Sequence, residues 1–422
     1  MRKIIVQKFG GTSVADTDKI KNVAKTVIRE KENGNDVVVV VSAMGHTTDY
    51  LVKMAKDLSP NPSGREMDML LSTGEGVSIA LLAMAIQAQG YDAVSFNAMQ
   101  IGIMTENIHS KARIIDIKTD KLKENLRQGK IIVVAGFQGV TEDGEITTLG
   151  RGGSDTSAVA LAAALNAERC DIYTDVEGVY TTDPRVVPNA SRLDEISYEE
   201  MLELAHAGAN VLHPRSVETA KQFNVPMRVR SSFKLDNLGT LVLGVDKMEI
   251  YKPVAGVAAD LSQARIVVCD VPDKPGVAAK LFSKLAKENI SVDMIIQSYA
   301  RKVSNTNDIA FTVDASDLPK TVEALEALKA EIGATGDVQV DENIAKVSIV
   351  GAGMIDRPGV ASTMFETLAE QGINIRMIST SEFKISCLVD KDQAQRAVRA
   401  LHTVFELESS EVADVKGDLP NV

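Results

Sequence analysis

The stretch Thr147-Thr148-Leu149-Gly150-Arg151-Gly152-Gly153-Ser154-Asp155-Thr156-Ser157 decides the fold of the first half of this chain. The mostly apolar residues 131–137 before it predict a buried strand, and residues 158–165 after it predict a helix. Glycines let the backbone turn sharply and approach a ligand closely. The N–H groups at the start of the helix can then bind an anion.

Charged and hydroxyl side chains are interleaved with these glycines. Arg151 offers a planar guanidinium that can hold a carboxylate or a phosphate through two hydrogen bonds. Ser154 and Asp155 can either cap the helix or face the ligand. A site that combines an anion cradle, a cation and a carboxylate suits a small zwitterion or a nucleotide. The alternative is an ordinary glycine-rich turn before a capped helix, and the interleaved charges favour the functional reading.

A second unit of strand, glycine turn and helix opens the chain. Residues 4–9 predict a strand, followed by Gly10-Gly11-Thr12-Ser13 and a helix. The turn is not a Walker A loop, because Lys8 precedes the glycines. A lysine at a strand end beside two glycine N–H groups is well placed to hold a transferring phosphoryl group. An ordinary strand-end lysine is the alternative.

The following segments supply more polar residues. Residues 36–41 predict a strand buried on both faces, and Ser42 then falls at the carboxyl edge where parallel sheets bind ligands. Residues 65–89 predict a helix interrupted at residues 72–76, where Glu75 stands between two glycines. Glycines inside a helix lower its stability, so this arrangement suggests a functional role for Glu75, such as holding an ammonium group. The alternative is a corner between two helices.

Residues 170–175 predict another strand, which enters a polar loop over residues 176–185. In that loop Tyr180 can pack on a base and Arg185 can reach phosphates, although a plain polar loop remains the alternative. His206 and His213 lack a metal partner at usable spacing, so both are interpreted as structural.

Length and composition set further bounds. The 422 residues predict two or three domains, and 45% apolar residues suffice for full cores. A net charge of -12 argues against a nucleic-acid partner. The three cysteines lie far apart and are interpreted as reduced core residues. The N-terminus enters a strand directly without a signal peptide, and no apolar run is expected to reach the length of a membrane span, so we expect a cytoplasmic protein.

The alternation of strands and helices predicts an α/β fold with a mainly parallel sheet sandwich over residues 1–245. Residues 239–256 are interpreted as a linker. Beyond it, Asp273-Lys274-Pro275-Gly276 recurs as Asp356-Arg357-Pro358-Gly359, offset by 83 residues. This self-similarity predicts a duplicated module of strand, turn, helix, two strands, helix and strand.

The chain resembles the aspartate kinases (aspartokinases) of the amino acid kinase superfamily. The resemblance rests on Lys8-Phe9-Gly10-Gly11-Thr12-Ser13, Ser42-Ala43-Met44, Gly74-Glu75, residues 147–155, residues 173–185 and Leu212-His213-Pro214. The repeat resembles a pair of ACT domains, small ferredoxin-like α+β modules that bind amino acids, over residues 263–340 and 341–416. In that family the last strand of one module can complete the other, which makes the boundary near residue 340 soft.

The resemblance implies that the γ-phosphoryl group of ATP, with Mg²⁺ bridging its phosphates, passes to the side-chain carboxylate of L-aspartate. The product is 4-phospho-L-aspartate, and this reaction is the first step toward lysine, threonine and methionine. The implied catalytic residues are Lys8, Arg151 and Asp155. The implied substrate-binding residues are Thr48, Glu75, Arg151, Gly152, Ser154 and Asp155. The implied nucleotide-binding residues are Lys8, Gly10, Gly11, Ser42, Thr174, Asp175, Tyr180 and Arg185; no protein-bound metal is implied.

The resemblance also implies feedback regulation by lysine, threonine or both. The implied effector residues are Asp273, Gly276, Ala278, Gln297, Asn374 and Ile375, with Thr380 and Ser381 at the interface of paired modules. Pairing implies a homo-oligomer or a hetero-oligomer, and Met248 is a candidate start for a separate short regulatory subunit. The alternative is a repeat that serves only to dimerise the enzyme.

Two positions depart from the family pattern. Gly76 stands where an arginine commonly follows the glutamate, and Asn210 stands where a lysine often precedes Val-Leu-His-Pro. The second change removes a candidate phosphate cation. Two other functions stay open at this point. One is a different amino acid kinase, acting on acetylglutamate or glutamate, and the other, suggested by Gly76 and Asn210, is an amino acid sensor that kept the fold but lost turnover.

Overall fold

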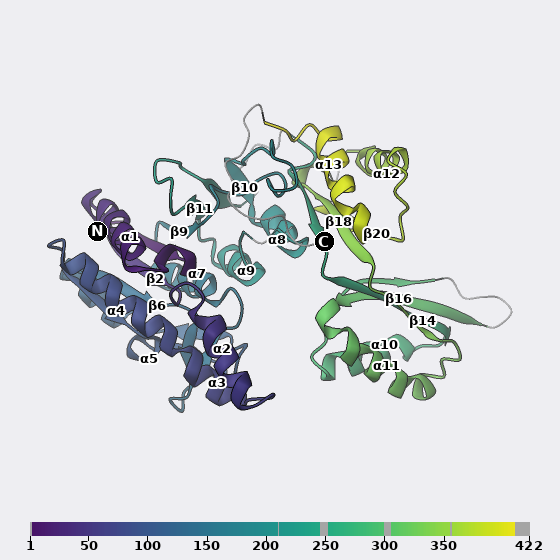
Figure 1. The fold of residues 1–422 in the computed structure, drawn as a ribbon, viewed down its shortest axis with the longest axis horizontal. Helices are drawn as coiled ribbons and strands as arrows, with labels where there is room; N and C mark the ends of the chain where they lie inside the picture. Colours follow the sequence, from purple (N-terminus) through teal and green to yellow (C-terminus); the bar gives the residue numbers. More distant parts are fainter. Residues whose placement is uncertain (1, 210, 245–251, 299–304, 355–356, 410–422) are drawn as a thin grey trace. The chain divides into compact units, whose positions relative to one another are not determined.

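A computed structural model describes residues 2–209, 211–244, 252–298, 305–354 and 357–409 (Figure 1). These residues fall into two compact units. The first unit comprises residues 1–181 and 191–250, and the second comprises residues 182–190 and 251–422. The short segment 182–190 belongs with the second unit because its carbonyls accept hydrogen bonds there. The Ser409 N–H donates to the Asn189 carbonyl (2.8 Å), and Arg399 Nε donates to the Val186 carbonyl (3.2 Å).

The first unit is built on an eight-stranded sheet. Across the sheet the strands are β10 (Glu195–Ser197), β12 (Thr240–Leu243), β11 (Met227–Ser231), β9 (Arg169–Thr174), β1 (Ile4–Phe9), β2 (Asp36–Val41), β6 (Ile131–Ala135) and β3 (Ala93–Phe96). The β11–β12 pair is antiparallel, and the other described pairs in this sheet are parallel. The mainly parallel sheet predicted from the sequence is therefore confirmed. The predicted linker begins too early, because β12 lies inside residues 239–256 and belongs to this sheet.

Helices cover the sheet, and a smaller sheet lies in the same unit. The helices are α1 (Thr17–Glu32), α2 (Thr47–Leu58), α3 (Gly64–Leu71), α4 (Thr73–Gln87), α5 (Ala98–Ile101), α6 (Asp120–Arg127), α7 (Gly153–Leu165), α8 (Tyr198–His206) and α9 (Pro214–Phe223), with a 3₁₀ turn over Gly11–Val14. The smaller sheet has the order β5 (Ile114–Ile117), β4 (Ile103–Thr105), β7 (Gln138–Val140) and β8 (Ile146–Thr148).

The run of five valines in β2 forms the centre of the core. Each valine is fully buried, because helices cover the sheet on both faces. Val37, Val39 and Val41 pack in one apolar cluster with residues of α1 and α4. The helix α7 packs on β1 and β2, and against α9. This packing fixes the strand ends, and with them the polar residues that follow each strand.

The glycine-rich interruption predicted in the helix over residues 65–89 is smaller than expected. The break between α3 and α4 lies at Ser72, whereas Gly74, Glu75 and Gly76 lie in the first turn of α4. Gly74 is required there by close packing, because a Cβ atom on it would lie 2.8 Å from the Cβ of Ala43.

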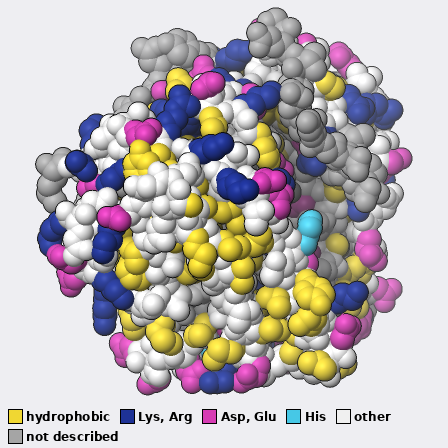
Figure 2. All heavy atoms as spheres, turned by 60° about the vertical axis from the view of Figure 1, so that its left-hand side comes forward, with side chains coloured by type: hydrophobic (Ala, Val, Ile, Leu, Met, Phe, Trp, Pro, Cys, Tyr) yellow, Lys and Arg dark blue, Asp and Glu magenta, His cyan; other side chains and the backbone are white. Residues whose placement is uncertain are grey.

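The helices α3 and α4 contradict the expectation that no apolar run could span a membrane. Residues Gly64–Gln87, 24 in all, are long and apolar enough by composition, and 44% of their most apolar window is buried inside the protein. Ile79, Leu82 and Ile86 of α4 belong to the sheet core, so we interpret this helix as a core helix. Its outer face remains apolar, with Val77 and Met84 exposed. Figure 2 shows apolar side chains gathered on the surface in this view of the molecule.

The second unit contains two four-stranded antiparallel sheets. One has the order β15 (Val292–Gln297), β16 (Thr306–Asp314), β14 (Gln263–Pro272) and β17 (Val338–Asp341), and its helices are α10 (Val277–Lys287) and α11 (Leu318–Ile332). The other has the order β13 (Gly256–Asp260), β18 (Ile344–Val350), β20 (Lys384–Asp390) and β19 (Met377–Thr380), and its helices are α12 (Val360–Glu370) and α13 (Ala394–Val404). The predicted repeat of α+β modules is therefore present.

The second module takes its fourth strand from an unexpected part of the chain. The strand β13, which precedes the first module, pairs antiparallel with β18 from Gly256 opposite Val350 to Asp260 opposite Lys346. The last strand of the first module, β17, stays in its own sheet beside β14. The first module is thus inserted between β13 and the rest of the second module. The expectation that the last strand of one module completes the other is wrong for this chain.

Candidate active site

Polar residues from several strand ends meet at the carboxyl edge of the large sheet. Lys8 is the penultimate residue of β1, Ser42 directly follows β2, and Thr174 ends β9. The parallel register places Lys8 opposite Val40 on β2 and Ile172 on β9. These residues therefore lie at the same edge of the sheet, which is where parallel α/β sheets bind their ligands.

Lys8 and Asp155 form an ion pair across this edge. Lys8 Nζ lies 2.6 Å from Asp155 Oδ1, and each side chain is 12% exposed. Asp155 lies in the first turn of α7, where the N–H groups of the helix also favour a negative charge. The partial burial strengthens the attraction over that of a surface pair. In this structure the two groups neutralise each other. An incoming phosphate can take the place of Asp155 beside Lys8, and an incoming ammonium group can take the place of Lys8 beside Asp155.

Ser154 connects this ion pair to the strand β2. Ser42 Oγ donates to Ser154 Oγ at 3.0 Å. Ser154 also presses against Gly136, where an added Cβ atom would lie 2.8 Å from the Ser154 side chain. Of the two roles that the sequence left open for Ser154 and Asp155, capping of α7 is excluded, because the N-cap is Gly152 at φ +65° and it has no side-chain hydrogen bond. Both side chains instead face the sheet edge.

Glu75 reaches the same edge from α4. It is 2% exposed, and its Oε1 accepts a hydrogen bond from the Ala43 N–H at 3.2 Å. Its Oε2 is buried and has no hydrogen-bond partner among the residues that the structure describes. Burial raises the pKa of Glu75 to about 7, against the hydrogen bonds that lower it. A buried carboxylate oxygen without a donor is a suitable acceptor for an ammonium group.

The two glycines after β1 approach neighbouring groups closely. A Cβ atom on Gly11 would lie 2.8 Å from the Ala43 carbonyl oxygen and 2.9 Å from that of Gly45. A Cβ atom on Gly10 would lie 3.6 Å from Lys8 Nζ. Gly10 therefore leaves the space beside the lysine open, and only a residue without a side chain fits at Gly11.

Arg151 lies between two glycines in the left-handed conformation, Gly150 at φ +77° and Gly152 at φ +65°. Its side chain is exposed, and within the described ranges it has no hydrogen-bond or ion-pair partner. Gly152 packs against the ring of His213 so closely that a Cβ atom there would overlap it. The guanidinium is thus available to a ligand, and its direction depends on the backbone that carries it.

The remaining residues predicted to bind the substrate or the nucleotide are Thr48, Thr174, Asp175, Tyr180 and Arg185. Thr48 lies half-buried in the first turn of α2, and no hydrogen bond from it to the residues above is seen in the described part of the chain. Thr174 Oγ1 donates to Asp175 Oδ1 at 3.1 Å. Tyr180 is half-buried and pairs with Arg192 through an isolated β-bridge. Arg185 belongs to the second unit and pairs with Asp183 at 2.7 Å.

The predicted effector residues lie in the two modules of the second unit. Asp273, Gly276 and Ala278 surround the start of α10, where Gly276 is the N-cap at φ +94°, and the exposed Gln297 ends β15. Asp273 accepts a hydrogen bond from the Asn307 side chain at 3.3 Å. In the second module Asn374, Ile375, Thr380 and Ser381 lie around β19, and Asn374, Thr380 and Ser381 are exposed. Asp356, Met248 and Asn210 lie outside the described residues.

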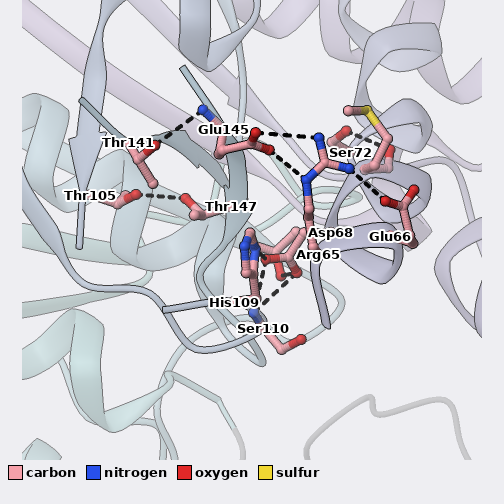
Figure 3. Close-up of polar contacts among 12 residues, drawn as sticks. Arg65, Glu66, Asp68, Ser72, Thr105, His109, Ser110, Thr141, Glu145 and Thr147 are labelled. Carbon is pink, nitrogen blue, oxygen red and sulfur yellow. Dashed lines mark hydrogen bonds and ion pairs between the residues drawn. The ribbon is translucent and has the colours of Figure 1, made fainter. Parts of the chain in front are cut away.

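Three residues near the site were not assigned a role in binding or catalysis from the sequence, and one of them, His213, was interpreted as structural. His213 packs on Gly152, and burial lowers its pKa while the nearby Asp155 raises it. Arg215 donates to the Leu149 carbonyl (2.5 Å) and to the Ala112 carbonyl (2.9 Å). Asp68 is fully buried among hydrogen-bond donors (Figure 3). The only sequence signal for any of them was Leu212-His213-Pro214, because the partners of Arg215 and Asp68 are far away along the chain.

The sheet edge gathers a lysine and two carboxylates beside two glycines, and Arg151 lies in the turn four residues before Asp155. Such a set can neutralise a phosphoryl group while it holds an amino acid by its ammonium and carboxylate groups. Among the described residues, no three His, Cys, Asp or Glu side chains are grouped as a metal site.

Family models match the whole arrangement of domains. Residues 3–231 match the amino acid kinase family, and residues 265–330 and 347–405 each match an ACT domain. The aspartokinase of Geobacillus stearothermophilus is 54% identical over 413 residues, which cover 98% of this chain and 99% of that protein. Aspartokinase 2 of Bacillus subtilis is 53% identical over 404 residues, which cover 96% of this chain and 98% of that protein.

Solved structures agree with these matches. The crystal structure of Escherichia coli aspartokinase III in complex with aspartate and ADP superposes with a TM-score of 0.81 at 30% identity, covering 95% of this chain and 99% of that chain. The complex of the same enzyme with lysine and aspartate gives a TM-score of 0.73 over the same shares of the two chains. Fold, site geometry and sequence identity over nearly the full length agree: this chain belongs to the amino acid kinase family, as an aspartokinase with two ACT domains.

Proposed function

We propose that this enzyme transfers the γ-phosphoryl group of ATP to the side-chain carboxylate of L-aspartate. A carboxylate oxygen of aspartate attacks the γ-phosphorus, the bond from that phosphorus to the bridging oxygen breaks, and ADP leaves. The product, 4-phospho-L-aspartate, would serve lysine, threonine and methionine biosynthesis. The observation that carries the proposal is the meeting of Lys8, Asp155, Ser154 and Glu75 at one sheet edge.

Each residue has a role that follows from its chemistry. Lys8 neutralises the transferring phosphoryl group, and Gly10, Gly11 and Ser42 line its path. Glu75 and Asp155 hold the substrate ammonium, and Arg151 holds its α-carboxylate, with Gly152, Ser154 and Thr48 beside the substrate. The acceptor carboxylate is already ionised, so no general base is needed, and catalysis consists of positioning and charge neutralisation. The complex of the related E. coli enzyme with aspartate and ADP supports this assignment of substrates.

The nucleotide is assigned to residues after β9. Thr174, Asp175, Tyr180 and Arg185 would bind ATP together with Mg²⁺, which would supply positive charge to the phosphate oxygens. Phosphoryl transfer generally requires such a cation, because charge builds up on the phosphate oxygens. The proposed domain limits are residues 1–245 for catalysis and residues 263–340 and 341–416 for the two modules, and β13 (Gly256–Asp260) adds a strand to the second module.

The second unit is assigned to regulation. The two ACT domains would bind lysine, threonine or both at Asp273, Gly276, Ala278, Gln297, Asn374 and Ile375. Thr380 and Ser381 would lie where modules of two copies pair in a cytoplasmic homo-oligomer, with or without a short regulatory subunit that starts at Met248. The lysine complex of the related E. coli enzyme supports regulation by an amino acid.

A hydroxylamine trap tests the reaction. Purified enzyme with Mg-ATP, hydroxylamine and L-aspartate should give aspartyl hydroxamate. Formation of hydroxamate from glutamate or acetylglutamate, but not from aspartate, would contradict the proposed substrate. An enzyme that consumes no ATP but binds lysine or threonine tightly would instead be the amino acid sensor.

A further inference from the structure

Asp68, on α3, is a fully buried carboxylate near the site that the proposed reaction does not use. Its side chain is fully buried and accepts hydrogen bonds from two other parts of the chain (Figure 3). Thr148 Oγ1 donates to Oδ1 at 2.6 Å, and the Ser110 N–H donates to Oδ2 at 2.9 Å and to Oδ1 at 3.1 Å. His109 Nδ1 lies 2.9 Å from Oδ2. Both carboxylate oxygens are therefore satisfied by donors far away in sequence.

These donors flank the backbone that carries Arg151. Thr148 ends β8 and lies two residues before Gly150. The Ser110 carbonyl oxygen approaches Gly150 so closely that a Cβ atom there would lie 2.9 Å from it. The two segments also contact each other directly, because the Ala112 N–H donates to the Thr148 carbonyl at 3.0 Å. Asp68 thus joins α3 to both segments at the point where the glycine-rich turn begins.

Arg151 depends on this support more than most side chains would. No described residue contacts its guanidinium through a hydrogen bond or an ion pair. The neighbours Gly150 and Gly152 have no side chains to restrict the backbone, so contacts from elsewhere must hold this turn. After Arg151, Gly152 is held by the ring of His213 and by the start of α7. Before Arg151, the turn is held by Arg215 on the Leu149 carbonyl and by Asp68 on Thr148. The direction of Arg151 is therefore set from two sides.

A role in stability alone does not explain a charged group at this position. A fully buried carboxylate loses its hydration, and packing of apolar residues commonly stabilises a protein as well or better. What a carboxylate adds is directional hydrogen bonding to several donors at once. We infer that Asp68 is a positioning residue for substrate binding, which acts through Thr148 and Ser110 to hold Arg151 toward the α-carboxylate of the amino acid substrate. The inference rests on the proposed function of Arg151.

Thr148→Val tests the inference because it removes one hydroxyl donor and nearly preserves side-chain volume. We expect the KM for aspartate to rise about tenfold, since small misplacements of binding groups have large effects, with the KM for ATP changed less than about twofold. Thr148→Ser keeps the hydroxyl and should restore a KM close to that of the unaltered enzyme. Asp68→Asn should act in the same direction, because an amide has one acceptor oxygen where the carboxylate has two.

Thr105→Val is the matched control. Thr105 Oγ1 lies 2.6 Å from Thr147 Oγ1 in the same small sheet and is equally buried, but it does not contact Asp68 (Figure 3). The Thr105→Val variant should lower the melting temperature about as much as Thr148→Val does, and its KM for aspartate should stay within about twofold of that of the unaltered enzyme. Equal KM values for all four variants, or the same rise in Thr105→Val and in Thr148→Ser, would overturn the inference while leaving the proposed reaction intact. An unaltered enzyme without turnover on aspartate would overturn both.

Discussion

At the scale of single residues, Lys8 carries the largest share of the proposed chemistry. Its ion pair with Asp155 is only partly exposed, so its charge is felt strongly at the sheet edge. We predict that Lys8→Ala lowers kcat by at least about 100-fold and weakens nucleotide binding much less, because the charge acts mainly on the transition state. Steady-state kinetics and calorimetric titration with Mg-ADP measure the two effects separately. A kcat close to that of the unaltered enzyme would remove Lys8 from the mechanism.

Glu75 makes substrate binding depend on pH. Its pKa of about 7 in the folded protein means that the carboxyl is largely neutral below that pH. An ammonium group requires the ionised form, so kcat/KM for aspartate should fall about tenfold per pH unit below pH 7. A pH profile of kcat/KM from 5.5 to 8.5 measures this. A flat profile over that range would show that Glu75 does not hold the ammonium.

The same carboxyl should affect the stability of the protein without substrate. Its folded pKa is raised above the ordinary value of 4.5, so the folded state binds more protons than the unfolded state between about pH 4.5 and pH 7. The stabilisation is complete below pH 4.5 and is lost as the pH rises through 7. Glu75→Gln serves as the control, because its melting temperature should lack this component of the pH dependence.

At the scale of elements, the junction between β8 and α7 requires glycine for two separate reasons. Gly152 has a φ of +65°, and His213 fills the space where a side chain would stand. Gly144, in the turn between β7 and β8, has a φ of +84° with nothing within 4 Å. We predict that Gly144→Ala costs about 1 kcal/mol through backbone strain. Gly152→Ala should cost about 3 kcal/mol or more, because overlap with the ring is added to the strain.

Urea unfolding of the two alanine variants measures this difference. The Gly152→Ala variant should also lose aspartate kinase activity, since the altered turn carries Arg151, whereas the Gly144→Ala variant should keep it. Equal losses of stability in the two variants would show that His213 yields to the new side chain without cost.

The sequence predicts these elements well where one local pattern decides them. The valine run placed β2, and residues 131–137 and 158–165 placed β6 and most of α7. The short strand β8, which contains Thr147 and Thr148 of the glycine-rich stretch, was not predicted. The cap of α7 was not predicted, because Ser154 and Asp155 have better partners in Ser42 and Lys8 than in the helix backbone. Asp68 gave no signal, because its donors lie about forty and eighty residues away in the chain, and only the fold brings them together.

At the scale of the whole molecule, the two modules were visible as a repeat, but the strand exchange between them was not. β13 carries no part of the repeated motif, and the whole first module lies between it and its partner β18 along the chain. Lys346 of β18 is buried there and lies close to Asp293 of the first module and 4.0 Å from Asp260 of β13. The two modules are therefore joined by this polar contact as well as by the strand β13, which precedes the first module and pairs within the second.

The pairing of β13 with β18 predicts which fragments of the second unit can fold. A fragment of residues 248–422 retains β13 and should be soluble and unfold cooperatively. A fragment of residues 262–422 exposes the edge of β18 and should aggregate, because a free hydrophobic edge strand pairs with other chains. Circular dichroism and size-exclusion chromatography compare the two. A stable monomeric 262–422 fragment would show that β13 is dispensable for the second module.

Regulation also belongs to this scale. Gln297, at the exposed end of β15, and Asn374, before β19, are the proposed contacts for an effector amino acid. We predict that Gln297→Ala or Asn374→Ala raises the concentration of lysine or threonine needed for half-inhibition by about tenfold, because the effector loses a polar contact. Activity without effector should stay unchanged. Inhibition curves for lysine, threonine and both together measure this, and curves that coincide with those of the unaltered enzyme would refute the proposed pocket.

The central claim is that two negatively charged reactants meet at one sheet edge, between Lys8, Glu75 and Asp155. The most direct test replaces Mg²⁺ by paramagnetic Mn²⁺ bound to ADP and measures the NMR relaxation of the side-chain carboxyl carbon of ¹³C-labelled aspartate bound to the enzyme. The account predicts a strong paramagnetic enhancement that is lost in Glu75→Gln. Bound aspartate whose carboxyl carbon relaxes at the same rate with and without Mn-ADP would place the reactants apart and contradict the account.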